Sequence, residues 1–359
     1  APSTPSESAP SEATGGVEGK ISFSVWDLET TPWLEPLAQA FMDANPGTEV
    51  EFINTPSAEY TDKLSVMLNG GTDFDVFMIK DADTTLNFAK KGQLEVLDYR
   101  IAADGIDLSV FNGLDGYFMF DGMQQALPIR TDYYVLYYNK DIFDAANEPY
   151  PSNDMTWEEF EEIAGRITAG TGTDKKYGAH LHTWQACVEN WAVQDGANTI
   201  MSTAPDYSYE FMRPAYEMAL RMQEAGYIQD YSTLKTGNIH YNSAFSTGQV
   251  GMMPMGTWFA ANMIGFVNNG ESEVNWGIAT LPHPEGLAAG NTVGSTTPIA
   301  INPNSKNKDL AWEFIKFATG DEGAAVLASY GQFPARTDDA LLDTITSVDG
   351  MPEGAKEAL

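Results

Sequence analysis

Three times near the start of the chain, a run of β-forming apolar residues is followed by residues at helical spacing. The runs lie at 20–26, 49–53 and 75–79. Strands that alternate with helices need crossover connections, so this rhythm predicts a largely parallel sheet with helices on its faces. Ligands of such sheets bind outside the carboxyl ends of the strands. The residues at 26–27, 54–55 and 80–81 are therefore expected at the edge of a site.

The second half of the chain has strand and helix signals of its own. Strand-like runs at 178–182, 250–254 and 276–281 predict a second sheet, and extended runs at 125–139 and 292–301 are expected to join it to the first. With 359 residues and 43% hydrophobic residues, the chain is long enough for two cores, because single cores stop growing at roughly 250–300 residues. Two α/β lobes are the predicted architecture.

The lobe boundaries follow from these connectors. Residues 1–16 are rich in Ser and Pro and hold no aromatic residue, so they are expected to form a flexible tether. The first lobe is predicted to comprise 17–128 plus 284–329. The second is predicted to comprise 129–283 plus 330–359.

Charge and cysteine usage exclude several classes of partner. The chain has 19 Lys and Arg against 51 Asp and Glu, a net charge of -32, which repels nucleic acids and anionic membrane surfaces. Uncharged ligands and cations remain possible. The lone Cys187 permits no intrachain disulfide and is expected to be a small core residue. The uncharged stretch 236–270 is too often broken by polar residues, Pro and Gly to span a membrane.

Common catalytic and metal-binding signatures are missing from the sequence. There is no nucleophile elbow, phosphate-binding Gly-Lys loop, zinc-protease helix or dinucleotide fingerprint. The many acids leave a glycoside hydrolase possible by residue count alone. His180 and His182 share one face of a predicted strand, but without a recognisable third ligand they are expected to line a cleft or make polar contacts. No metal and no cofactor are predicted.

Aromatic and polar side chains recur where predicted strands end. Sugars present apolar C–H faces framed by hydroxyls, so their sites combine flat aromatic rings with planar polar groups. Each Trp taken alone more often packs in a core. Their joint placement favours a carbohydrate site, and the residues concerned are Trp26, Asp27, Lys80, Asp81, Asp83, His182, Trp184 and Trp258.

Several longer stretches carry a resemblance to a known family. They are 137–143 with Pro151, 156–160, 244–258, 307–317 and 333–336. Through them, the chain from Lys20 to Arg336 resembles the extracellular solute-binding proteins of carbohydrate ABC importers, which are related to maltose- and oligosaccharide-binding proteins.

The resemblance implies a two-lobed fold, periplasmic-binding-protein-like, in which each lobe is a mainly parallel sheet flanked by helices. Such a protein closes about hinge strands on a neutral oligosaccharide and delivers it to an ABC transporter permease, without catalysis. Hinges are then expected near 127–132, 282–285 and 330–333. A monomer outside the cell is expected, held at the surface by an N-terminal lipid anchor, although the anchoring cysteine of the family does not appear in this sequence.

The resemblance also implies individual site residues, at the positions that match those of the family. Trp258 is implied to stack on the sugar, whereas Asp81, Trp26 and Asp27 are implied to contact its hydroxyls. The remaining expected ligand-binding residues are Tyr60, Asp83, Arg130, Asp132, His182, Trp184, Trp191, Gly294, Ser295 and Arg336. Two other classes of function stay open: a glycoside hydrolase with two facing carboxylates, and a receptor for polyamines or peptides with charged anchors.

Overall fold

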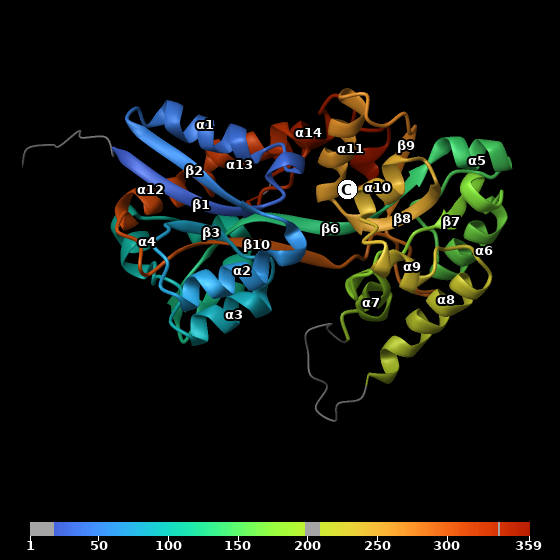
Figure 1. Cartoon of the computed structure of the whole chain (residues 1–359), viewed down its shortest axis with the longest axis horizontal. Helices are drawn as coiled ribbons and strands as arrows, with labels where there is room; N and C mark the ends of the chain where they lie inside the picture. The colour runs from blue at the N-terminus through green and yellow to red at the C-terminus, as the bar shows by residue number, and fades with distance from the viewer. Residues whose placement is uncertain (1–17, 198–208, 337) are drawn as a thin grey trace, which may run out of the picture.

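The protein consists of two α/β lobes that lie side by side and share one long strand (Figure 1). The computed structural model describes residues 18–197, 209–336 and 338–359. The predicted tether 1–16 lies outside these residues. Strand β6 (Leu127–Asn139) pairs with the first lobe through its first half and with the second lobe through its second half. The expected α/β, two-lobed class is therefore confirmed.

The first lobe is built on the sheet that the strand and helix rhythm predicts. Strands β2 (Thr48–Thr55) and β3 (Val76–Met78) both run parallel to β1 (Gly19–Trp26). Strand β10 (Gly294–Ile301) lies between β3 and β6 and is antiparallel to both. The carboxyl ends of β1, β2 and β3 consequently meet at the edge that faces the second lobe (Figure 1).

Two separate cores fill the two faces of this sheet. On one face, the rings of Phe23, Phe41 and Phe314 pack edge to face. On the other, Phe77 packs with Tyr60 and Phe88. The helices of the first face are α1 (Leu34–Ala44), α12 (Lys308–Ala318) and α13 (Asp321–Ser329); those of the second face are α2 (Ser57–Asn69) and α3 (Ala82–Lys90). Helix α4 (Asp98–Asp104) and the hairpin of β4 (Met119–Phe120) and β5 (Met123–Gln124) complete the lobe.

The sheet of the second lobe is mixed rather than mainly parallel. Strands β8 (Val250–Gly256) and β9 (Trp276–Thr280) are both antiparallel to β6, and β7 (Tyr177–Ala179) is parallel to β8. Because β6 runs outward from the first lobe and β8 and β9 are antiparallel to it, the carboxyl ends of β8 and β9 face the first lobe.

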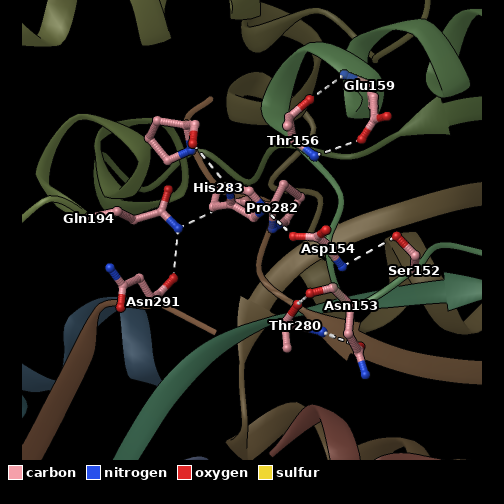
Figure 2. A network of polar contacts seen from close by, with 11 residues as sticks. Ser152, Asn153, Asp154, Thr156, Glu159, Gln194, Thr280, Pro282, His283 and Asn291 are labelled. Carbon is pink, nitrogen blue, oxygen red and sulfur yellow. Dashed lines mark hydrogen bonds and ion pairs between the residues drawn. The ribbon is translucent and has the colours of Figure 1, made fainter. Parts of the chain in front are cut away.

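Helices surround this second sheet. Helix α6 begins at a capping box, in which Thr156 and Glu159 each bond the other's backbone N–H (Figure 2). Cys187 is buried in the core of this lobe, as expected. The helices are α5 (Lys140–Ala146), α6 (Trp157–Ile167), α7 (Ala186–Val193), α8 (Arg213–Glu224), α9 (Tyr231–Thr236), α10 (Tyr241–Ser246) and α11 (Trp258–Asn268).

The chain also returns between the lobes near its C-terminal end. Residues 333–335 pair with β6 at Ile129–Thr131, on the first-lobe half of that strand. Helix α14 (Asp339–Thr346) packs on α13, and α15 (Ala355–Ala358) joins the core of the second lobe. Across the described ranges, no helix is long and apolar enough to cross a bilayer.

Close packing of α6 on β7 gives a test of the second lobe. A Cβ added to Gly178 would lie 1.9 Å from the carbonyl oxygen of Ala164, so Gly178→Ala must push α6 off the sheet. We expect a loss of about 1–3 kcal/mol in the free energy of unfolding, measured by urea denaturation. Gly265→Ala is the control, because nothing lies within 4 Å of its added Cβ. It should be neutral or stabilising by up to about 1 kcal/mol, and an equal loss in both variants would contradict the packing described.

Candidate ligand-binding site

A cavity of about 550 Å³ lies between the two lobes. The first lobe contributes residues that follow the carboxyl ends of β1, β2 and β3, as the strand order predicts. The second lobe contributes the segment before α7, the end of α9 and the starts of α10 and α11. The principal residues that line the cavity are Trp26, Asp27, Ser57, Lys80, Arg130, Asp132, Tyr134, His182, Trp184, Lys235, His240, Tyr241, Trp258, Asn262, Ser295 and Gln332.

The wall formed by the second lobe is aromatic. The Trp184 ring is 39% exposed and lies 5.3 Å from the Tyr241 ring and 6.1 Å from the Trp258 ring, centroid to centroid. Tyr134 meets Trp258 edge to face at 5.6 Å. These contacts fix the rings in place while one of them stays open to the cavity, so the wall offers flat apolar surface to a ligand.

The position of Trp258 depends on a glycine at the end of β8. A Cβ added to Gly256 would lie 1.9 Å from an atom of the Trp258 ring. Only glycine lets the indole fold back over the strand end, because it has no side chain. The segment 243–258 thus brings Trp258 to the cleft, as expected for an aromatic residue that follows a predicted strand.

The wall formed by the first lobe is polar. The Asp27 carboxylate accepts a 2.7 Å hydrogen bond from the backbone N–H of Ser57, which ties the end of β1 to the start of α2. Lys80 donates to the carbonyl oxygen and to Oγ of the same Ser57, at 2.6 and 2.7 Å. An ammonium has three N–H groups, so one remains for a ligand. Burial lowers the pKa of Lys80.

Trp26 belongs to this polar wall but is not a free stacking surface. The Lys80 ammonium and the Arg130 guanidinium lie 5.4 and 5.9 Å from its ring centroid, and the Tyr60 ring lies 5.0 Å away. Cations attract the electron-rich face of an indole. The Trp26 ring therefore positions two cations at the cavity.

An ion pair sits where the shared strand passes the cavity. Asp132 on β6 is 1% exposed, and its Oδ1 accepts hydrogen bonds from Gln332 at 3.0 Å and Thr257 at 3.2 Å. Arg130 lies 3.5 Å from the other carboxylate oxygen and also donates to Gln332 and Thr297. Burial raises the pKa of Asp132, and Arg130 opposes that rise. This network joins β6, β10 and both lobes.

His180 and His182 lie behind and beside the aromatic wall, with ring centroids 5.7 Å apart. They are 2% and 6% exposed, and burial lowers their pKa to about 4 and about 3. Both rings are therefore neutral at pH 7. His182 lines the cavity. Its Nδ1 and the Nε2 of His180 have no hydrogen-bond partner in the protein. Within the described ranges, no group of three or more His, Cys, Asp or Glu side chains is arranged to hold a metal ion.

Part of the predicted ligand-binding set lies together in this cavity. The members that line it come from both lobes and from the shared strand, as expected for a site between two lobes. They are Trp26, Asp27, Arg130, Asp132, His182, Trp184, Trp258 and Ser295.

The other predicted site residues lie outside the lining. Tyr60 is buried and donates to the carbonyl oxygens of Ser24 and Met78, so it supports the strand ends from behind. Asp81 caps α3, and Asp83 lies in the first turn of that helix. The last three are Trp191, which packs on Trp157; Gly294, which pairs with Tyr133; and Arg336, which forms an ion pair with Asp321.

Some lining residues were not among the predicted ones. Lys80 was expected at the edge of the site but not among the ligand-binding residues, and Ser57 follows the end of β2, so strand position was a usable signal for both. Gln332 lies within an expected hinge segment. His240 and Tyr241 begin a short helix, and nothing in their local sequence distinguishes them from ordinary surface or core residues.

Comparison with known proteins shows the family. Residues 27–325 match the family of bacterial extracellular solute-binding proteins, and the chain belongs to this family. A sugar transporter from Rhizobium etli, solved in an open conformation, is 41% identical, with 95% of this chain and 87% of that chain covered and a TM-score of 0.75. The resemblance seen in the sequence is confirmed.

More distant relatives agree with this fold. The diacetylchitobiose binding protein of Streptomyces coelicolor is 27% identical, and the match covers 86% of this chain and 71% of that protein. An ABC substrate-binding protein of Listeria monocytogenes, solved with cycloalternan, has a TM-score of 0.81 at 22% identity, over 95% of this chain and 86% of the other. The likeness to the Listeria protein concerns the fold alone.

The buried histidines predict how stability depends on pH. The pKa of His180 is about 4 in the folded protein against about 6.5 when unfolded, so between these values only the unfolded chain binds the proton. Stability from this group is present above pH 6.5 and is lost as the pH falls. From pH 7 to pH 5 the loss amounts to about 2 kcal/mol.

Urea denaturation of the native chain and of His180→Asn at both pH values measures this effect. Other groups titrate in both proteins, so the difference between them isolates His180. The variant should lose less stability on acidification. An identical loss in the two proteins would contradict the neutral, buried state of His180.

Proposed function

We propose that the cavity binds a neutral saccharide, that the lobes close around it, and that the protein delivers it unchanged to the permease of an ABC importer. The observation that carries this proposal is the pairing of an aromatic wall on one lobe with a hydrogen-bonding wall on the other, in a chain of the solute-binding family.

The two walls match the two kinds of surface that a sugar presents. The exposed ring of Trp184 beside Trp258 suits the apolar C–H face of a pyranose. Across the cavity, Asp27 offers a carboxylate acceptor and Lys80 an unused N–H. Beside Trp184 on the aromatic wall, His182 has a ring nitrogen with no hydrogen-bond partner in the protein. Vicinal hydroxyls both donate and accept, so each group has a partner on the ligand.

Closure follows from the placement of the walls on different lobes. A ligand that contacts Trp184 and Asp27 together makes its full set of contacts only when the lobes approach each other. Such a ligand stabilises the closed form by its higher affinity for it. The names of relatives support a sugar or polyol: a Rhizobium sugar transporter, a diacetylchitobiose binding protein, and an erythritol/L-threitol-binding protein of Mycolicibacterium smegmatis.

The charges that line the cavity argue against the two alternatives. A polyamine receptor needs an excess of acids, but among the described lining residues Lys80, Arg130 and Lys235 face only Asp27 and Asp132. A glycoside hydrolase needs two carboxylates free for chemistry. Asp132 is buried and held by Arg130 and Gln332, which leaves Asp27 as the one carboxylate among the described lining residues that is open to a ligand. Binding without bond cleavage fits these side chains better.

The family supports an inference about where the protein acts. We infer that the protein acts as a monomer outside the cell, at the membrane surface, where a permease receives the sugar. The family is extracellular. The sequence at 1–16, rich in Ser and Pro, has the composition of a tether that connects the lobes to a lipid anchor.

Removal of the aromatic wall tests the proposed ligand. Trp184→Ala and Trp258→Ala should each cost about 1–3 kcal/mol of binding free energy, because each removes stacking surface. Titration calorimetry against a panel of neutral oligosaccharides, with spermidine and peptides alongside, measures this. Tyr231→Ala is the matched control, since Tyr231 is an aromatic residue of the same lobe that is 54% exposed and does not line the cavity.

Two results would overturn the proposal. The first is heat of binding with spermidine or peptides and none with any sugar. The second is release of shorter sugars from the panel during incubation, detected by chromatography, which would indicate hydrolysis.

A further inference from the structure

One connection between the lobes is bonded to the second lobe near both of its ends. It is the linker 281–293, which leaves β9 and enters β10. Its first residues, Leu281 to His283, are buried, whereas residues 285 and 286 are exposed. An interlobe linker is where bending is expected in a two-lobed receptor. The contacts of this linker therefore decide where bending occurs.

The near end of the linker is bound to the start of α6. The backbone N–H of His283 donates to the carbonyl oxygen of Met155 at 3.1 Å, and its carbonyl oxygen accepts from the N–H of Trp157 at 3.1 Å. Its ring contacts a carboxylate oxygen of Asp154 at 3.2 Å (Figure 2). Bending at 282–285, where the sequence suggests a hinge, would break all of these contacts.

A single buried amide then joins the two ends of the linker. Nε2 of Gln194 donates to the carbonyl oxygens of Pro282 at 2.8 Å and Asn291 at 2.9 Å (Figure 2). Its Oε1 accepts from the indole N–H of Trp157 at 2.7 Å. Residues 283–290 are thus a loop whose neck is closed at Pro282 and Asn291.

The chemistry of these partners fixes the orientation of the amide. An indole N–H can only donate, and a backbone carbonyl can only accept, so Oε1 must face Trp157 and the NH₂ group must face the linker. Gln194 is 6% exposed, so water does not substitute for these bonds. A Glu at this position would fit in shape but would place a carboxylate oxygen against two carbonyl oxygens.

The same residue is connected to the aromatic wall of the cavity. Gln194 caps the C-terminal end of α7, and that helix begins two residues after Trp184. Trp191 on α7 packs against Trp157 with ring centroids 6.1 Å apart. Gln194 does not itself line the cavity. It nevertheless links the wall that holds Trp184 to the linker that leads to the first lobe.

Beyond the neck, Oγ1 of Thr292 donates to the carbonyl oxygen of Tyr134, and the carbonyl oxygen of Val293 accepts from the N–H of Tyr134, so the far end of the linker bonds the shared strand. We propose that Gln194 is a positioning residue for lobe closure: it closes the neck of the linker, so that residues 282–293 move as one unit with the second lobe and bending is left to β6 and β10 where they continue into the first lobe. Without the clamp, only the two bonds to Tyr134 hold the far end of the linker, so the linker separates from the second lobe more readily and the lobes sample a wider range of relative positions. The part of this proposal that concerns sugar affinity rests on the proposed function, because it requires that the lobes close on a ligand.

The spread of lobe positions can be measured without any ligand. Spin labels on Val66→Cys in α2 and Leu220→Cys in α8 report the distance between lobes, since these positions are 71% and 56% exposed. Cys187 is 3% exposed, and burial raises its pKa to about 12, so it stays unlabelled. By pulsed electron spin resonance, Gln194→Met and Gln194→Glu should broaden the distance distribution relative to the labelled native background, with Glu the larger effect.

Thr156→Ala is the matched control. It removes the N-cap of α6 in the same network and should lower the melting temperature, but it leaves the neck of the linker intact. Its distance distribution should equal that of the native background. An unchanged distribution in both Gln194 variants, or equal broadening in Thr156→Ala, would overturn the proposal.

Sugar binding supplies a second readout. For any neutral oligosaccharide that the native chain binds, Gln194→Met should raise Kd roughly tenfold, although the residue touches no ligand. An unchanged Kd for such a sugar would overturn the link to affinity. If no sugar binds the native chain, the proposed function fails while the distance measurement still decides the role of Gln194.

Discussion

The backbone hydrogen bonding of β6 is the constraint on which the rest of the structure depends. At Tyr133 this strand still pairs with Gly294 of β10, and at Tyr134 it already pairs with Gly256 of β8. One continuous strand therefore belongs to two sheets. The change of partners occurs beside the cavity, so the polar groups of Arg130 and Asp132 are fixed at the junction and the walls of the cleft stand on either side of it.

Local sequence was enough to predict the first lobe, because its signals are local. Each strand of the repeated unit is followed by its own helix, and the crossover rule then fixes the parallel order. The carboxyl ends of these strands are the place where Trp26, Asp27 and Lys80 meet. For the same reason, Trp258 could be assigned to the cleft from the strand that precedes it.

The remaining features depend on contacts between distant parts of the chain, which one sequence does not display. The antiparallel strands of the second lobe follow from the direction in which β6 enters it. Tyr60 and Asp81 follow or flank strand ends much as Asp27 does, yet one points into the core and the other caps a helix. Side-chain direction at a strand end is set by packing, so proximity to the cleft was predictable and contact with it was not.

The glycine at the end of β8 bears on which wall of the pocket can change when ligand selectivity changes. The Trp258 ring leaves no room for a side chain at position 256, and Tyr134 supports that ring edgewise. This half of the pocket therefore tolerates little variation. The opposite half is built from Ser57 and Lys80, which contact each other and can change together. Substitutions that alter selectivity are therefore easier to accommodate on the hydrophilic side, because they need not displace a closely packed ring.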